Sequence, residues 1–188
     1  LSTILSSVAL IDQYAERGDI DKLHKHIHRI KHSVRGLTEI LEDILSLSRL
    51  EEGKIQVEWN KIHLKNSLNE WLDELIPILK EGQTFQLHYH GSDEIHCDPK
   101  ILKNVVINLL SNAVKFSPED KKILLTVELN GDDFTLMIQD EGIGIPSLEL
   151  NHLFQRFHRA SNAVNIPGTG LGLSIVKRCV ELLGGDIF

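Results

Sequence analysis

A row of apolar residues between residues 23 and 44 limits most strongly what this chain can fold into. Its members are spaced four and three apart: Leu23, Ile27, Ile30, Val34, Leu37, Leu41 and Ile44. This spacing predicts a long helix with one apolar stripe, as in a coiled coil or a helical bundle. A shorter row of the same kind precedes it: Leu1, Ile4, Val8 and Ile11. It predicts a first helix that ends in the polar stretch 16–21, with Gly18 as the turn residue.

The two rows together predict an antiparallel helical hairpin over residues 1–53. Two helices with one apolar face each cannot bury those faces well alone, so a second copy completing a four-helix bundle is the economical arrangement. We therefore expect a homodimer through residues 1–50. The stripe stops near residues 48–54, where Gly53 is a plausible helix cap, and a second domain is expected over 54–188.

The composition bounds the class of protein. The 188 residues, 41% of them hydrophobic, suffice for one or two domains with real cores. The chain has 20 Lys and Arg against 27 Asp and Glu, a net charge of −7. Nucleic-acid binding needs a basic surface, so this charge argues against it. Cys97 and Cys179 lack CxxC spacing and fit reduced, buried thiols. These thiols favour a reducing compartment, the cytoplasm. No apolar run approaches ~20 residues, so we expect the chain to be soluble. Because it opens in the middle of an amphipathic pattern, we expect it to be a piece of something longer.

Residues 54–188 alternate between strand and helix patterns. We expect strands at 55–64, 83–91, 94–98, 121–129 and 133–140. We expect helices at 65–82, 99–117 and 174–185, the second opened by Pro99. The turn Asn130-Gly131-Asp132 predicts an antiparallel hairpin, and 146–167 has no regular pattern. The fold class is therefore expected to be α+β, with the helices on one face of a sheet.

Three glycines at alternate positions, Gly168, Gly170 and Gly172, lead into the last helix. Walker A spacing is absent, and the stretch does not follow a strand as a dinucleotide-binding fingerprint does. Glycines let backbone N–H groups approach phosphate oxygens, and the start of a helix stabilises negative charge. Taken alone, the stretch could equally be a flexible connection.

Two further groups of residues could complete a phosphate site. Asn108, Asn112 and Lys115 share one helix face; a carboxamide oxygen suits Mg²⁺, and an ammonium group suits phosphate. Exposed amides are the alternative. Asp140 comes at the end of a strand, and Gly142 and Gly144 after it keep side chains out of the way. Its carboxylate could accept a hydrogen bond from an exocyclic amine such as that of adenine. A simple Asp-rich turn is the alternative there.

These stretches resemble, in order, the motifs of sensor histidine kinases. Residues 107–117 (INLLSNAVKFS) resemble the N box, 140–146 (DEGIGIP) the G1 box, 154–160 (FQRFHRA) the F box and 168–177 (GTGLGLSIVK) the G2 box. Residues 48–54 (SRLEEGK) resemble the end of the second helix of the dimerisation hairpin. The resemblance implies a dimeric hairpin followed by the ATP-binding α/β sandwich that DNA gyrase and mismatch-repair ATPases share. The implied activity is transfer of the γ-phosphoryl of Mg·ATP to a histidine, then to an aspartate of a response-regulator receiver domain.

The resemblance also implies roles for single residues. Asn112 matches the magnesium ligand, Asp140 matches the adenine-binding aspartate, and Asn108, Lys115 and Arg159 match residues near the phosphates and are the candidate catalytic residues. Phe154 and Phe157 match aromatic anchors of the F box, and residues 146–167 match the ATP lid. The residues expected to contact nucleotide are Asn108, Asn112, Lys115, Phe116, Asp140, Gly142, Gly144, Ile145, Phe157, His158, Arg159, Gly168, Thr169, Gly170, Leu171, Gly172 and Leu173.

The family's phosphoacceptor histidine is not matched within the chain. Leu1 corresponds to the leucine that ends the acceptor segment, so the acceptor is expected about six residues upstream, under two helical turns away. The histidines of the second helix lie outside the apolar stripe, and we expect them on a solvated face: His24, His26, His28 and His32. A metal site on them, a dimeric nucleotide-binding scaffold without kinase activity and a hydrolysing ATPase of the same fold remain alternatives.

Overall fold

The computed structural model of the chain describes residues 2–52, 55–131 and 133–188. Its contacts divide the chain into two compact units, Leu1–Ser46 and Leu47–Phe188. Within the described ranges, no helix is both long enough and apolar enough to cross a membrane.

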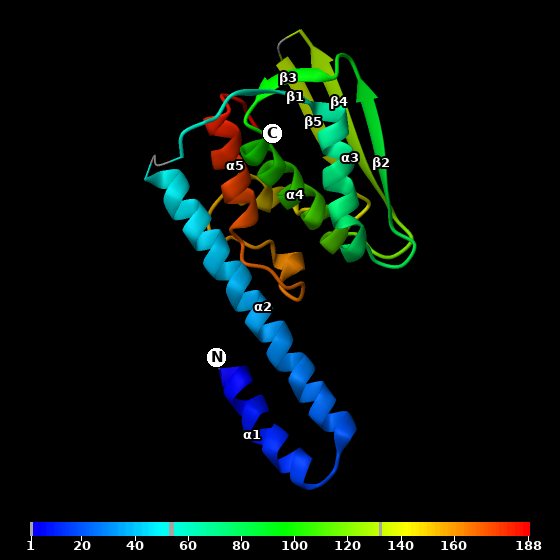
Figure 1. Ribbon diagram of the computed structural model, residues 1–188, viewed down its shortest axis with the longest axis vertical. Helices are drawn as coiled ribbons and strands as arrows, with labels where there is room; N and C mark the ends of the chain where they lie inside the picture. Colours follow the sequence, from blue (N-terminus) through cyan, green and yellow to red (C-terminus); the bar gives the residue numbers. More distant parts are fainter. Residues whose placement is uncertain (1, 53–54, 132) are drawn as a thin grey trace. The chain divides into compact units, whose positions relative to one another are not determined.

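The first unit is the expected helical hairpin. Helix α1 (Ser2–Glu16) and helix α2 (Ile20–Glu51) lie side by side, joined by a short turn (Figure 1). Gly18 takes a left-handed conformation with φ +69°, and the Asp19 N–H closes the turn onto the Tyr14 carbonyl at 3.0 Å. The predicted turn residue is therefore confirmed, while Gly53, the suggested cap of α2, lies outside the described residues.

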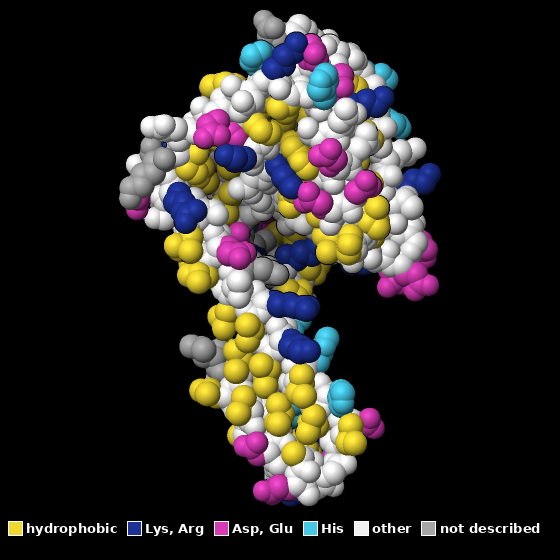
Figure 2. Space-filling view, in the orientation of Figure 1, with side chains coloured by type: hydrophobic (Ala, Val, Ile, Leu, Met, Phe, Trp, Pro, Cys, Tyr) yellow, Lys and Arg dark blue, Asp and Glu magenta, His cyan; other side chains and the backbone are white. Residues whose placement is uncertain are grey.

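Much of the apolar stripe of the hairpin is exposed in the single chain. Figure 2 shows hydrophobic side chains gathered along the hairpin surface. Those at least 39% exposed within this unit are Leu5, Val8, Ile20, Val34, Leu37, Ile40, Leu41, Ile44 and Leu45. An exposed apolar row of this kind is typical of an interaction surface.

His26 differs from the expectation of a solvated histidine face. Its side chain is only 7% exposed and stacks on the Tyr14 ring, with the ring centroids 5.5 Å apart. The expectation was wrong for His26 because helix α1 covers this position, and a spacing argument on one helix cannot reveal what its neighbour covers. Among the described residues, no group of three or more His, Cys, Asp or Glu side chains could hold a metal ion.

The second unit is an α+β sandwich. Its three-stranded sheet has the order β2 (Thr84–His90), β4 (Lys122–Asn130), β5 (Asp133–Gln139). Strands β4 and β5 form the predicted antiparallel hairpin, whereas β2 and β4 run parallel, with Phe85 opposite Ile123. A parallel pair needs a crossover connection, and the long helix between the two strands supplies it.

A second, two-stranded sheet pairs β1 (Asn60–His63) with β3 (Glu94–Cys97) in antiparallel fashion. The predicted strand 55–64 was too long. Its pairing partner β3 has only four residues before α4 begins, so only four residues of the predicted strand can pair. Upstream of β1, the Glu58 N–H donates to the Asp98 carboxylate at 2.8 Å instead of to a strand.

Three helices lie on one side of the larger sheet: α3 (Leu64–Leu75), α4 (Pro99–Phe116) and α5 (Gly172–Leu182) (Figure 1). The predicted helix over 65–82 is too long: α3 ends at Leu75, ahead of Pro77, which has no N–H to continue the ladder, and a 3₁₀ turn, η1 (Ile76–Ile78), contains this proline. The α+β class with helices on one face is confirmed.

Helix α4 separates two apolar clusters of the second unit. On one side Leu102, Val106 and Leu110 pack with α3 and the sheet. On another side Ile101 and Val105 pack with buried residues of α5 and of residues 47–50. The side chain of Leu110 is completely buried, so the position of α4 is closely determined.

Cys97 and Cys179 are buried and form no disulfide. Burial raises the pKa of each thiol to about 11, so both remain protonated at neutral pH and are poor nucleophiles. This agrees with the expected reduced, buried thiols.

Asp98 caps the start of α4 and also fixes the segment before β1. One carboxylate oxygen accepts from the Lys100 and Ile101 N–H groups at 2.9 and 3.2 Å, and the other accepts from Glu58. The residue is only 3% exposed, so water cannot replace these bonds.

Asp98→Ala is therefore expected to lower the free energy of unfolding by about 1–3 kcal/mol, since it leaves buried N–H donors unpaired. Urea unfolding followed by circular dichroism measures this loss. Asp98→Asn is the matched control, because it keeps an oxygen acceptor and should lose less. Equal midpoints for all three proteins would contradict the role assigned to this cap.

Candidate functional site

The polar strip of α4 forms as predicted and is longer than expected. Asn108 and Asn112 are half-buried, and the strip continues one turn upstream to Asn104. The Asn108 side-chain amide donates to the carbonyl and to the side-chain oxygen of Asn104, at 2.9 and 2.7 Å. The sequence did offer a signal for Asn104, because it lies four residues before Asn108 on the same helix face.

The C-terminal end of α4 is held by two residues that carry no recognisable motif. Gln83, only 5% exposed, donates to the Val114 carbonyl at 3.2 Å. Lys80 donates to the Lys115 carbonyl at 2.9 Å and to the Ser117 carbonyl. The last carbonyls of a helix have no partner within the helix, so these contacts stabilise the end that carries Lys115.

The G1 segment approaches the same helix end through its backbone. The Ile143 N–H donates to the Phe116 carbonyl at 3.3 Å, and a Cβ added to Gly142 would lie 2.7 Å from that carbonyl oxygen. The Asp140 carboxylate accepts the Gly142 N–H at 2.8 Å, which fixes the carboxylate at the edge of the site. Gly142 is required here because any side chain would push the segment away from α4.

The rest of G1 is tied to the lid. Gly144 has φ +66°, and its carbonyl accepts from the Asn162 side chain at 2.9 Å. Ile145 is 48% exposed beside it. Asn162 was not predicted as a site residue, and only its position inside the lid could have suggested it.

The lid contains two short 3₁₀ turns, η2 (Ser147–His152) and η3 (Ser161–Ala163), where the sequence showed no regular pattern. His158 Nε2 lies 2.9 Å from a Glu149 carboxylate oxygen. The Ser161 N–H, and then His158, lower the pKa of the Glu149 carboxyl. These contacts join the two turns across the lid.

Arg159 and Phe157 point to different surroundings. The Arg159 guanidinium donates to the carbonyls of Ala163 and Val164, at 2.7 and 3.1 Å, and to the Ile166 carbonyl. In this conformation it therefore organises the lid backbone. Phe157 is 65% exposed with φ +60°, whereas Phe154 is half-buried.

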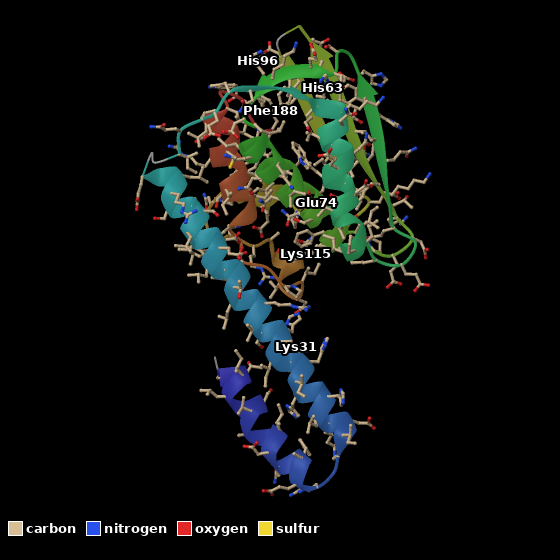
Figure 3. The ribbon with its side chains drawn as sticks, in the orientation of Figure 1. Lys31, His63, Glu74, His96, Lys115 and Phe188 are labelled. Atoms are coloured by element: carbon tan, nitrogen blue, oxygen red, sulfur yellow. The ribbon has the colours of Figure 1, made fainter. Side chains whose placement is uncertain are left out.

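The G2 glycines bring the start of α5 against α4. A Cβ added to Gly172 would lie 3.2 Å from Asn108 Oδ1 and 3.8 Å from Asn112 Nδ2. A Cβ added to Gly168 would collide with Lys115 Nζ, and Figure 3 shows Lys115 of α4 beside the lid segment. Side chains at these two glycines would therefore fill the space beside the polar strip.

The residue that precedes α5 is buried beneath the site. Leu171 is completely buried, and its N–H donates to Thr169 Oγ1 at 3.1 Å. Leu173, two residues further on, is half-buried. Among the described residues, no side chain caps the helix at Leu171. The first N–H groups of α5 are thus the kind of group that binds an anion at a helix N-terminus.

The structure therefore gathers most of the predicted residues around one place, the end of α4 and the start of α5. The polar strip, the G1 segment and the G2 glycines meet there. Arg159 is instead engaged with the lid's own carbonyls.

The comparisons with known proteins agree with this geometry. The model of the family described as histidine kinase-, DNA gyrase B-, and HSP90-like ATPases matches residues 97–188. The circadian input-output histidine kinase CikA of Synechococcus elongatus is 36% identical over 174 residues, which cover 89% of this chain but 23% of CikA.

Two solved structures share the fold. Histidine kinase AdeS of Acinetobacter baumannii has a TM-score of 0.73 at 24% identity, covering 97% of this chain and 87% of that one. Histidine kinase ThkA, solved in complex with response regulator protein TrrA, has a TM-score of 0.67 at 22% identity, covering 97% of this chain and 52% of that one.

Residues 97–188 are an ATPase domain of the histidine kinase, gyrase and HSP90 type. The chain carries a catalytic domain of the sensor histidine kinase type. The resemblance drawn from the sequence motifs is confirmed. The chain spans less than a quarter of the length of CikA.

Gly170 gives a test of how the G2 segment is packed. Its φ is +73°, and an added Cβ would lie 2.8 Å from the Phe157 carbonyl carbon and 2.9 Å from the His158 carbonyl oxygen. Gly131 has a similar φ of +66° with nothing within 4 Å of an added Cβ, so it is a matched control.

Both Gly170→Ala and Gly131→Ala are expected to cost about 1 kcal/mol for the left-handed backbone. Only Gly170→Ala should also separate the G2 segment from the F box. Hydrogen–deuterium exchange should therefore rise over residues 154–172 in Gly170→Ala alone. The same exchange in both variants would contradict this packing.

Proposed function

We propose that residues 97–188 bind Mg·ATP and that, in the whole protein, its γ-phosphoryl passes to a histidine and then to an aspartate of a response regulator. The observation that carries this proposal is the meeting of the α4 polar strip, the G1 segment and the uncapped start of α5. In this proposal the start of α5 binds the phosphates, the G1 segment binds the adenine and the polar strip binds the magnesium ion.

The triphosphate belongs at the start of α5 beside Lys115. Backbone N–H groups and the helix dipole attract phosphate oxygens there, and Lys115 adds a positive charge. Gly168 and Gly172 fit this ligand, because a side chain at either position would occupy the space beside Lys115 or Asn108. Phosphoryl transfer depends mainly on such positioning and charge neutralisation.

The adenine belongs at the G1 segment. One Asp140 oxygen is occupied by the Gly142 N–H, which leaves the other oxygen to accept from an exocyclic amine. Gly144, Ile145 and Phe116 would border the base.

Magnesium would be held by Asn112. A carboxamide oxygen fits this ion, which in phosphate sites takes few protein ligands and keeps most of its coordination for water and phosphate oxygens. When bound, the ion would neutralise charge on the phosphates during transfer.

The lid residues would act when nucleotide is bound. Arg159 would exchange its lid carbonyls for the terminal phosphate, with Phe157 and His158 beside it on the lid. The backbone of Thr169, Gly170, Leu171 and Leu173 would complete the enclosure of the phosphates.

The hairpin would supply the dimer interface and the docking face for the response regulator. Its exposed apolar row supports a homodimer, since a second copy would cover that row in a four-helix bundle. A response-regulator partner is supported by ThkA, which was solved with one. We place this part of the protein in the cytoplasm, where ATP and receiver domains occur.

Two substitutions distinguish the contribution of adenine recognition to nucleotide affinity from that of magnesium. Asp140→Asn should weaken ADP binding about tenfold or more, with or without Mg²⁺, because a neutral carboxamide replaces the charged hydrogen-bond acceptor of the amine. Asn112→Ala should weaken binding only when Mg²⁺ is present. Titration calorimetry with ADP, in Mg²⁺ and in EDTA, measures both. Unchanged affinity in both variants would refute the site.

Transfer is tested in the full-length protein with γ-labelled Mg·ATP. We expect acid-labile, base-stable label on a histidine upstream of Leu1, and retention of that label when His24, His26, His28 and His32 are replaced. Nucleotide binding without label would favour a scaffold, and release of inorganic phosphate without label would favour a hydrolysing ATPase.

A further inference from the structure

Asn104 lies at the upstream end of the α4 polar strip and holds the side chain of Asn108. Its carbonyl oxygen and its side-chain oxygen lie 2.9 and 2.7 Å from the Asn108 side-chain nitrogen. Both asparagines are half-buried on the same face of α4. No motif matched above assigns a role to Asn104.

The chemistry of these atoms fixes which way the Asn108 amide is turned. A backbone carbonyl can only accept, so the Asn108 atom beside it must be the NH₂ group. That NH₂ group has two protons, and the second meets the Asn104 side-chain oxygen. With both protons engaged, the Asn108 oxygen must point the other way.

The Asn108 oxygen faces the start of α5. A Cβ added to Gly172 would lie only 3.2 Å from this oxygen. A carbonyl oxygen there would repel a bare phosphate oxygen, but it suits a magnesium ion or a water bound to one. The orientation therefore favours nucleotide binding only when the metal accompanies the nucleotide.

We propose that Asn104 is a positioning residue, which turns Asn108 so that its oxygen serves the magnesium of a bound magnesium nucleotide. The proposal rests on the proposed function for the choice of ligand, whereas the orientation itself rests on the two hydrogen bonds. With Asn104 shortened, one proton loses its partner and the amide can rotate away.

The orientation is tested first without nucleotide. We expect the two Asn108 side-chain amide protons to exchange slowly with solvent in NMR spectra of the parent. Asn104→Asp keeps an acceptor and should preserve this protection, whereas Asn104→Ala should lose it for one proton. Equal protection in all three proteins would overturn the proposal.

The consequence is tested by calorimetry with ADP. In Asn104→Ala, Kd should rise about three- to tenfold with Mg²⁺, the range of one lost hydrogen bond, and by less than about twofold in EDTA. Lys103→Ala is the matched control, because Lys103 precedes Asn104 on α4 but pairs with Glu74 of α3 at 2.6 Å. It should match the parent in both conditions.

An equal loss of affinity with and without Mg²⁺, or no loss in either, would overturn the role of Asn104. If the parent itself bound no Mg·ADP, the proposed function would fail instead, while the NMR result would still decide whether Asn104 orients Asn108.

Discussion

The packing of α4 on two sides is the constraint on which the rest of the second unit depends. Leu102, Val106 and Leu110 bind it to the sheet, while Ile101 and Val105 bind it to α5. The remaining side carries the asparagines and Lys115. Because close-packed interiors tolerate little displacement, the two apolar sides fix the direction of the third. Apolar packing on the other two sides of α4 thus determines where the polar side chains of the site point.

Both ends of α4 are satisfied by residues from other segments, which extends this control to the surroundings. Asp98 at the start of α4 accepts from Glu58 in the segment before β1, and Lys80 and Gln83, in the loop before β2, donate to carbonyls of the last turn of α4. The Phe116 carbonyl binds the G1 segment. Helix-end groups that need partners therefore hold the G1 segment at the end of α4 that carries Lys115.

The motif residues were predictable because their spacing carries the information. Asn108, Asn112 and Lys115 share a face by helix periodicity alone, and the strands around Gly131 follow from alternation and turn chemistry. Other features were not predictable. The parallel pairing of β2 with β4, the burial of His26 under α1 and the capping by Gln83 join residues far apart in the chain, and no local pattern encodes such contacts.

The sequence by itself determined the family, the order of the elements and the identity of the chemical groups, since each is written in short-range spacing. The tertiary structure decided which way those groups face. It engages Arg159 with three lid carbonyls, leaves Phe157 exposed and turns the Asn108 oxygen toward Gly172. The physical reason is that the direction of a side chain depends on the partners that neighbouring segments offer, and only the folded chain brings those segments together.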